Sequence, residues 1–293
     1  MSFKSGFISI IGRPNAGKST LLNFILGEKL SIISSKPQTT RNVIRAVHNS
    51  DSCQMVFLDT PGIHEHKGLL NEYMVKEALS QIKDVDVILY IIDSSAGITR
   101  EDKFIISELK KAKPPVVVAV NKIDSGTKET LLPIIDKLSK EYGFSEVYPL
   151  SAKKGDGVGE LLNFIESKLP EGPKYFPDDE ITDRPERFVA SEMIREKVFN
   201  NTSDEVPYSV AITIDEFKDR EKVVAIKASI NVDRDSQKGI IIGKKGSMLK
   251  KIGTEARLDL ENFLGCKVYL ELFVRVQKNW TKSTKGLKDF GYE

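Results

Sequence analysis

The sequence predicts an α/β domain with a mostly parallel sheet and helices on both faces, followed by a smaller α+β domain. From residue 7 to about residue 169, short apolar runs alternate with helical patterns, which is typical of strand–helix–strand units. Residues 170–179 then lose all periodicity, as a linker does. We therefore divide the chain into a first domain at 1–169, a linker at 170–186 and a second domain at 187–293.

In the first domain, the strands and helices are predicted from their apolar spacing. The strand-length apolar runs lie at 7–11, 56–59, 85–93, 115–121 and 147–150. The helical patterns lie at 71–83, 101–113, 127–142 and 157–169. The runs at 85–92 and 116–120 are almost entirely apolar, as in central strands that are buried on both faces.

Composition and charge narrow the class of protein. The 44 basic and 42 acidic residues leave a net charge of only +2. Net charge alone therefore does not predict a nucleic-acid partner, and the local distribution of charge must decide. Cys53 and Cys266 are too few for a disulfide framework, which favours a reducing cytoplasm. Because no long apolar segment follows the first residues, we expect neither a signal peptide nor a membrane anchor.

A phosphate-binding loop follows the first strand. The pattern G-x-x-x-x-G-K-[ST] predicts that backbone N–H groups surround phosphate oxygens, that Lys18 reaches the β and γ phosphates and that Ser19 binds Mg²⁺. The loop consists of Gly12, Arg13, Pro14, Asn15, Ala16, Gly17, Lys18, Ser19 and Thr20. By itself this loop fits an ATPase, a kinase or a GTPase.

Two further motifs end predicted strands and identify the nucleotide. The first is Asp59-Thr60-Pro61-Gly62, where the carboxylate could hold Mg²⁺ and Gly62 lets its N–H approach the γ-phosphate. The second is Asn121-Lys122-Ile123-Asp124. The carboxylate of Asp124 could accept two N–H bonds from guanine, which adenine does not offer.

A third stretch, Ser151-Ala152-Lys153, follows the strand at 147–150. There the N–H of Ala152 is expected near guanine O6. In this order and spacing, the four stretches resemble the translation-factor-related class of P-loop GTPases. The resemblance covers residues 5–169 and implies GTP or GDP and Mg²⁺ as ligands.

The same resemblance indicates two nucleotide-sensing loops. In the first, at 34–41, comparison with related Thr-Thr-Arg sequences favours Thr40 as the residue that completes the Mg²⁺ shell, with Thr39 second. The second runs from Gly62 to about Leu70, and its residues 64–68 are expected to be mobile and solvated.

The catalytic residues expected from these motifs are Lys18, Thr40, Gly62 and Asn15. Ile63 follows Gly62 where Ras-like proteins have a glutamine that orients water. We therefore expect slow intrinsic hydrolysis. Related GTPases that lack the glutamine use the asparagine that matches Asn15 to hold K⁺ in place of an arginine finger.

In the second domain, a G-x-x-G turn lies between apolar residues and a helix. Residues 238–257 hold six basic side chains and one acid, and paired glycines allow a phosphodiester chain to approach. The stretch resembles the loop of a type II KH domain, which clamps single-stranded RNA. The RNA-binding residues expected from it are Ile242, Gly243, Lys244, Lys245, Gly246, Lys250 and Lys251.

A predicted helix at 187–200 and two strands at 209–216 and 223–231 precede this loop. The strands are joined by a charged turn at 217–221, and a helix at 247–264 and a strand at 267–277 follow the loop.

Together, the two domains resemble the Era family of bacterial GTPases across nearly the whole chain. That resemblance implies binding near the 3′ end of 16S ribosomal RNA, a role in assembling the 30S subunit, and a cytoplasmic protein with peripheral association with the inner face of the cell membrane. We also expect a monomer. Two other classes of function remain as alternatives, an RNA-binding scaffold whose nucleotide only stabilises the fold, and a GTP-dependent RNA-modifying enzyme.

Overall fold

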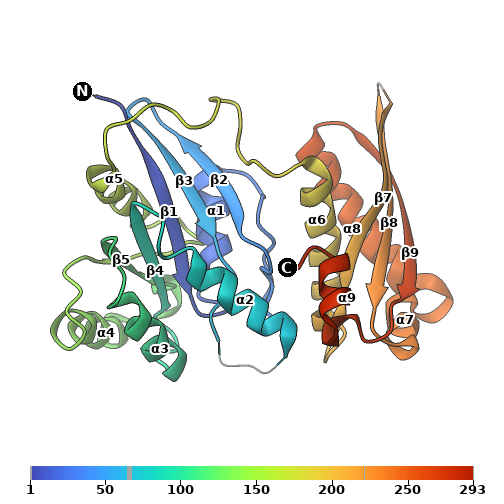
Figure 1. The fold of residues 1–293 in the computed structure, drawn as a ribbon, viewed down its shortest axis with the longest axis horizontal. Helices are drawn as coiled ribbons and strands as arrows, with labels where there is room; N and C mark the ends of the chain where they lie inside the picture. The colour runs from blue at the N-terminus through green and yellow to red at the C-terminus, as the bar shows by residue number, and fades with distance from the viewer. Residues whose placement is uncertain (1, 65–67, 221, 293) are drawn as a thin grey trace. The chain divides into compact units, whose positions relative to one another are not determined.

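The computed structural model describes residues 2–64, 68–220 and 222–292, which form two compact units (Figure 1). The first unit holds residues 2–31, 40–64 and 74–183. The second holds residues 32–39, 68–73, 184–220 and 222–292. Within the described residues, no helix is both long enough and apolar enough to cross a bilayer.

The first unit contains a six-stranded sheet in the order β2-β3-β1-β4-β5-β6. Its pairs are parallel except for β2 with β3, which is antiparallel, so the predicted mostly parallel sheet is confirmed. The strands are β1 (Lys4–Gly12), β2 (Ile44–Asn49), β3 (Cys53–Asp59), β4 (Val87–Asp93), β5 (Val116–Asn121) and β6 (Val147–Pro149). Because the parallel strands run the same way, β1, β3, β4 and β5 end at one edge of the sheet.

Five helices of the described residues accompany this sheet, although only residues 74–80 of α2 belong to the first unit. They are α1 (Lys18–Leu26), α2 (Leu69–Ser80), α3 (Arg100–Leu109), α4 (Lys128–Lys140) and α5 (Val158–Lys168). Every residue of β4 is buried. Its residues Ile88, Tyr90 and Ile92 pack with apolar side chains of α2, α3 and α4. The residues between them, such as Leu89, face the opposite side of the sheet and are equally buried. The apolar strands were therefore predicted correctly as central strands.

The first unit extends beyond the predicted domain limit at residue 169. Gly172 N donates to the carbonyl of Phe3 at 3.1 Å, Gln54 Oε1 accepts the backbone N–H of Tyr175 at 2.7 Å, and Val47 N donates to Ile181 O at 2.9 Å. Most of the predicted linker at 170–186 is therefore hydrogen-bonded along this unit, which ends at residue 183. Edge strand β2 was not predicted, and its pairing with β3 and with residue 181 explains why it forms.

The second unit contains a three-stranded sheet in the order β7-β8-β9 (Figure 1). Strands β7 and β8 pair antiparallel, and β8 and β9 pair parallel. The elements are α6 (Glu186–Asn201), β7 (Ala211–Arg220), β8 (Val223–Val232), α7 (Asp235–Ile242), α8 (Ser247–Leu264), β9 (Lys267–Val276) and α9 (Thr284–Asp289). Apolar residues of α6, α8 and the strands, among them Val198, Ile252 and Ile230, form its core.

Three features of this unit differ from the sequence prediction. Strand β7 continues through most of the predicted turn at 217–221, because Phe217 still pairs with Ile226. Helices α7 and α9 were not predicted. Glycine lowers helix propensity, which explains why the segment containing Gly239 was interpreted as loop.

Residues 32–39 and 68–73 cluster with the second unit, although the sequence assigned them to the first domain at 1–169. For residues 32–39, hydrogen bonds between side chains and backbone carbonyls at α6 give the reason. Arg195 Nη2 donates to the carbonyl of Thr39 at 2.6 Å. Lys36 Nζ donates to the carbonyls of Phe199 and Thr202 near the end of the helix.

Candidate functional site

The phosphate loop connects β1 to α1 at the carboxyl edge of the first sheet. Gly17 has φ = 100° and Asn15 has φ = 61°, both in the left-handed region that reverses the chain direction. Lys18 bends back over the loop, and its Nζ donates to the carbonyls of Gly12 and Arg13 at 3.2 and 3.1 Å. The ammonium group is thus held above the loop, where phosphate oxygens could replace these carbonyls as its acceptors.

Burial also changes the protonation of this lysine. Desolvation lowers the pKa of Lys18 to about 8, although the nearby carboxylate of Asp59 opposes that effect. Lys18 is 6% exposed. A negatively charged phosphate would favour the charged ammonium form.

The loop after β3 contacts the phosphate loop. Ile63 N donates to Gly12 O at 3.2 Å, and Thr60 Oγ1 donates to Ile10 O at 2.7 Å. A Cβ atom on Gly62 would lie 2.6 Å from the backbone nitrogen of Pro14. This close approach explains why glycine is needed at that position.

Ser19, Thr40 and Asp59, the three predicted Mg²⁺ ligands, are brought together. Ser19 Oγ donates to Asp59 Oδ2 at 2.7 Å and lies 3.0 Å from Thr40 Oγ1. Thr39, the second choice, instead donates to Lys36 O at 2.7 Å. The geometry therefore favours Thr40.

These oxygens fit a hard divalent cation. Mg²⁺ prefers oxygen ligands and is usually held by few protein groups together with phosphates and water. Asp59 is buried, and its Oδ1 has no hydrogen-bond partner among the described residues. Within that same part of the chain, no three His, Cys, Asp or Glu side chains form a group that could hold a metal. Hydroxyl groups and one carboxylate are thus the available ligands.

The predicted base-binding motif connects directly to the phosphate loop. Asn121 ends β5, and its Nδ2 donates to Ala16 O at 2.9 Å. Its Oδ1 accepts the N–H groups of Lys122 at 2.7 Å and of Ala152 at 2.9 Å. The N–H of Ala152, expected near guanine O6, thus donates to Asn121.

The exposed carboxylate of Asp124 is held by the buried side chain of Ser151. Ser151 Oγ donates to Asp124 Oδ1 at 2.7 Å, and this hydrogen bond holds the pKa of Asp124 below its usual value. The carboxylate is therefore ionised, oriented and exposed to solvent, as recognition of two guanine N–H groups requires. Lys153 is also exposed.

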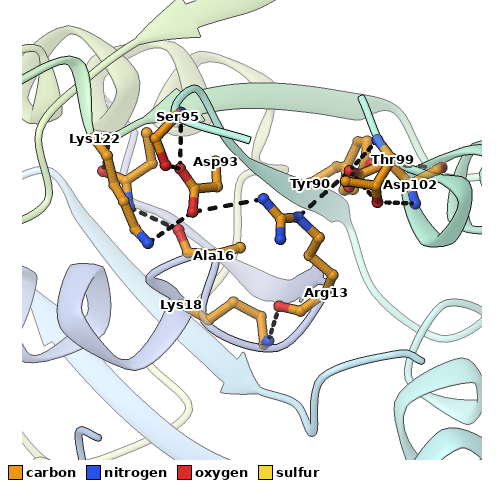
Figure 2. A network of polar contacts seen from close by, with 10 residues as sticks. Arg13, Ala16, Lys18, Tyr90, Asp93, Ser95, Thr99, Asp102 and Lys122 are labelled. Carbon is orange, nitrogen blue, oxygen red and sulfur yellow. Dashed lines mark hydrogen bonds and ion pairs between the residues drawn. The ribbon is translucent and has the colours of Figure 1, made fainter. Parts of the chain in front are cut away.

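The sequence missed an ionic network behind the phosphate loop (Figure 2). Arg13 of the loop lies between the carboxylates of Asp93 and Asp102, and Lys122 pairs with Asp93. Asp93 is the last residue of β4. A sequence signal did exist, because Asp93 ends a strand in the same way as Asp59 and Asn121.

The loop at 64–68 was expected to be solvated, and for His64 this is wrong. His64 is buried, and its Nδ1 lies 2.9 Å from Gly62 O. Ile63 is also fully buried and belongs to the core cluster under α2–α4. Residues 65–67 lie outside the described residues.

The predicted RNA loop joins α7 to α8 in the second unit. Gly243, Lys245 and Gly246 have φ values of 70°, 53° and 79°, so the chain makes a tight reversal. A Cβ atom on Gly243 would lie 2.7 Å from Met248 Cβ. Ile242 is half-buried, whereas the lysines of the predicted site are all exposed: Lys244, Lys245, Lys250 and Lys251.

Comparison with known proteins is consistent with both sites. Residues 7–122 match the family model of the 50S ribosome-binding GTPases, and residues 205–281 match that of the KH domain. GTPase Era of Geotalea uraniireducens is 56% identical over 99% of this chain and 98% of its own length. GTPase Era of Syntrophus aciditrophicus is 52% identical over 99% of this chain and 95% of its own length.

Solved structures agree over the same length. The chain is similar, with a TM-score of 0.96 and 44% identity over 99% of both chains, to Era in complex with MgGDPNP and nucleotides 1506–1542 of 16S ribosomal RNA. It is also similar, with a TM-score of 0.95 and 44% identity over 99% of both chains, to a point variant of Aquifex aeolicus Era bound to GDP.AlF4⁻. With relatives this similar from end to end, the chain belongs to the Era family of GTPases.

Proposed function

We propose that this protein is a GTP-hydrolysing switch that binds single-stranded RNA near the 3′ end of 16S ribosomal RNA and assists assembly of the 30S subunit. The observation that carries the proposal is the presence of two built sites in one chain. One is the Ser19–Thr40–Asp59 cluster beside the phosphate loop, and the other is the lysine-rich turn at 243–246. A similar Era structure contains both kinds of ligand, MgGDPNP and a 16S ribosomal RNA segment.

In the nucleotide site, each group has a defined task. Asp124, oriented by Ser151, selects guanine, and Lys18 neutralises phosphate charge. Mg²⁺ held by Ser19, Thr40 and Asp59 would offset charge on the β and γ phosphates. Gly62 lies against Pro14 of the phosphate loop, and its backbone N–H would donate to the γ-phosphate.

Hydrolysis is expected to be slow without a further element, because the buried Ile63 cannot orient water. We propose that Asn15 binds a K⁺ ion. Asn15 belongs to the phosphate loop and has a left-handed backbone conformation. Hydrolysis should then be several-fold faster in KCl than in NaCl at equal ionic strength. Equal rates in the two salts would remove Asn15 from this role.

In the RNA site, the exposed lysines of the turn at 243–246 and the start of α8 supply positive charge to a phosphodiester chain.

The proposal also couples the nucleotide to RNA binding through the segment 32–39, which is hydrogen-bonded to α6 of the second unit. Since Thr40 directly follows that segment and is a proposed Mg²⁺ ligand, nucleotide state and RNA affinity are coupled in the proposal. Reciprocity then requires RNA to alter nucleotide affinity.

RNA binding is tested with a short RNA that carries the 3′-terminal sequence of 16S ribosomal RNA. We expect Lys244→Ala with Lys245→Ala to weaken binding at least tenfold, because two cations at the phosphate contact are lost. Lys137→Ala on α4, a partly exposed lysine paired with Glu141 in the first unit, is the control. Equal affinity of the double variant and the control would contradict the RNA site.

The alternative of a scaffold, in which nucleotide only stabilises the fold, is separated by Lys18→Ala. A folded variant that still supports 30S assembly in cells would favour the scaffold. The proposal also includes a cytoplasmic monomer with peripheral contact to the inner face of the cell membrane. Gel filtration and cell fractionation test these two points.

A further inference from the structure

We propose that Asp93 is a positioning residue for nucleotide binding, because it ties the phosphate loop and the base-binding motif to the end of the central strand β4. No other carboxylate in the described part of the chain pairs with a cation of each motif. The inference rests on the proposed GTPase function and adds a residue that lies outside its four motifs.

Asp93 contacts the base-binding motif through Lys122. Lys122 Nζ donates to Asp93 Oδ2 at 2.7 Å, and the two side chains are 35% and 7% exposed. Lys122 has φ = 67°, a left-handed conformation that is unfavourable for a non-glycine residue. The ion pair therefore helps to stabilise a backbone turn that leads directly to Asp124, the residue proposed to bind guanine.

The phosphate loop is held by the same carboxylate. Arg13 Nη2 lies 3.5 Å from Asp93 Oδ2, and Arg13 Nε lies 3.4 Å from Asp102 Oδ2 (Figure 2). Asp102 is itself fixed by Tyr90 and by Thr99 at the start of α3. Arg13 thus extends from the phosphate loop and lies between two buried carboxylates.

The carboxylate of Asp93 is rigid and ionised. Its Oδ1 accepts the backbone N–H of Ser95 at 2.9 Å and the hydroxyl of Ser95 at 2.6 Å. Burial tends to raise the pKa of Asp93, but the hydrogen bonds from Lys122 and Ser95 together hold it below its ordinary value. Because Ser95 occupies Oδ1, Oδ2 is directed at Lys122 and Arg13.

Position in the sheet explains why an aspartate at this point contacts both motifs. Asp93 pairs with Asn121 across β4 and β5, and Gly12 pairs with Ile91 across β1 and β4. Strand β4 lies between the strands that end in the two motifs. The side chain of Asp93, the last residue of β4, therefore contacts both loops. The nucleotide would then be bound by two loops that are both held by this carboxylate.

The test compares Asp93→Asn with Asp86→Asn in the full chain. Asp86 precedes the same strand at its other end, where its Oδ2 accepts Phe7 N at 2.7 Å. The substitution removes the negative charge from this hydrogen bond, which lies away from the nucleotide loops. The measurements are the dissociation rate of a fluorescent GDP analogue, kcat at saturating GTP, and the unfolding temperature without nucleotide.

For Asp93→Asn we expect GDP to dissociate roughly tenfold faster, the scale expected when one charge-assisted hydrogen bond is lost. The kcat at saturating GTP should stay within about twofold, because Asp93 contacts no reacting group. Asp93→Glu, which keeps the charge, should give an intermediate rate. Asp86→Asn should stay within about twofold of the parent in GDP dissociation even if its unfolding temperature falls.

An Asp93→Asn variant that releases GDP within twofold of the parent rate would overturn the inference. So would an acceleration matched by Asp86→Asn. If Asp93→Asn does not fold, Ser95→Ala decides. Freeing Oδ1 should accelerate GDP dissociation two- to threefold, and an unchanged rate would overturn the inference. GDP binding by the parent protein separately tests the proposed function.

Discussion

The hydroxyl of Ser19 donates a hydrogen bond of 2.7 Å to the Oδ2 atom of Asp59. The two residues come from the start of α1 and the end of β3, so this bond joins the phosphate loop to the neighbouring strand end. With Thr40 Oγ1 3.0 Å from Ser19 Oγ, three segments supply oxygens to one small site. This cluster leads to the first prediction.

Replacing Asp59 with asparagine should reduce GTP hydrolysis in Mg²⁺ at least tenfold, because a charged ligand becomes neutral. Hydrolysis is followed by phosphate release over a range of Mg²⁺ concentrations. GDP affinity measured in EDTA should change much less, and a large loss in EDTA would indicate a general defect of the phosphate loop instead.

Replacing Asp124 with asparagine should weaken the binding of guanine nucleotides by a factor of roughly one hundred or more. The reason is that a carboxylate that accepts two N–H groups is replaced by an amide. The same amide can donate to the extra carbonyl of xanthine, so XDP should bind better than GDP. The matched control is Ser125→Ala. Ser125 adjoins Asp124 and donates to its other oxygen at 3.4 Å. GDP affinity retained in Asp124→Asn would refute the base assignment.

Gly62→Ala should lower both hydrolysis and stability. The added Cβ would lie 2.6 Å from Pro14 N, so the two loops would have to separate. We expect about 1–3 kcal/mol of destabilisation from this overpacking, measured by urea unfolding. Gly159→Ala is the control, because a Cβ there meets no atom within 4 Å in helix α5. It should stabilise the protein slightly.

His48 on strand β2 should make stability depend on pH. Burial lowers the pKa of His48, although a backbone hydrogen bond involving Ile25 opposes that effect. Because the folded pKa lies below the unfolded value near 6.5, the unfolded chain gains the proton first as the pH falls. Stability should therefore decrease from about pH 6.5 downward until the folded pKa is passed.

The check is the urea midpoint of the first unit's transition at pH 7.5, 6.5 and 5.5. His48→Gln should show a flatter profile over this interval. A parent protein whose midpoint does not change between pH 7.5 and 5.5, or a variant with the same slope, would contradict the prediction.

Local sequence patterns were sufficient to predict the order of the main elements and the strand ends at which the nucleotide-binding motifs lie. The motifs at Gly12–Thr20, Asp59–Gly62 and Asn121–Asp124 are local, and each follows an apolar strand, so a parallel sheet brings their ends to one edge. The glycines and lysines at 243–246 are equally local. Spacing along the chain was enough to place Ser19 and Asp59 in one site.

In contrast, contacts between residues far apart in the sequence could be identified only from the folded structure. Strand β2 depends on pairing with β3, and residues 170–183 depend on contacts such as that of Tyr175 with Gln54. The pairing of Asp93 with Lys122 and Arg13 joins three strand ends. A local pattern can mark a strand-end residue such as Asp93, but it does not encode the partners, because side chains far apart in the sequence become neighbours only in the folded sheet.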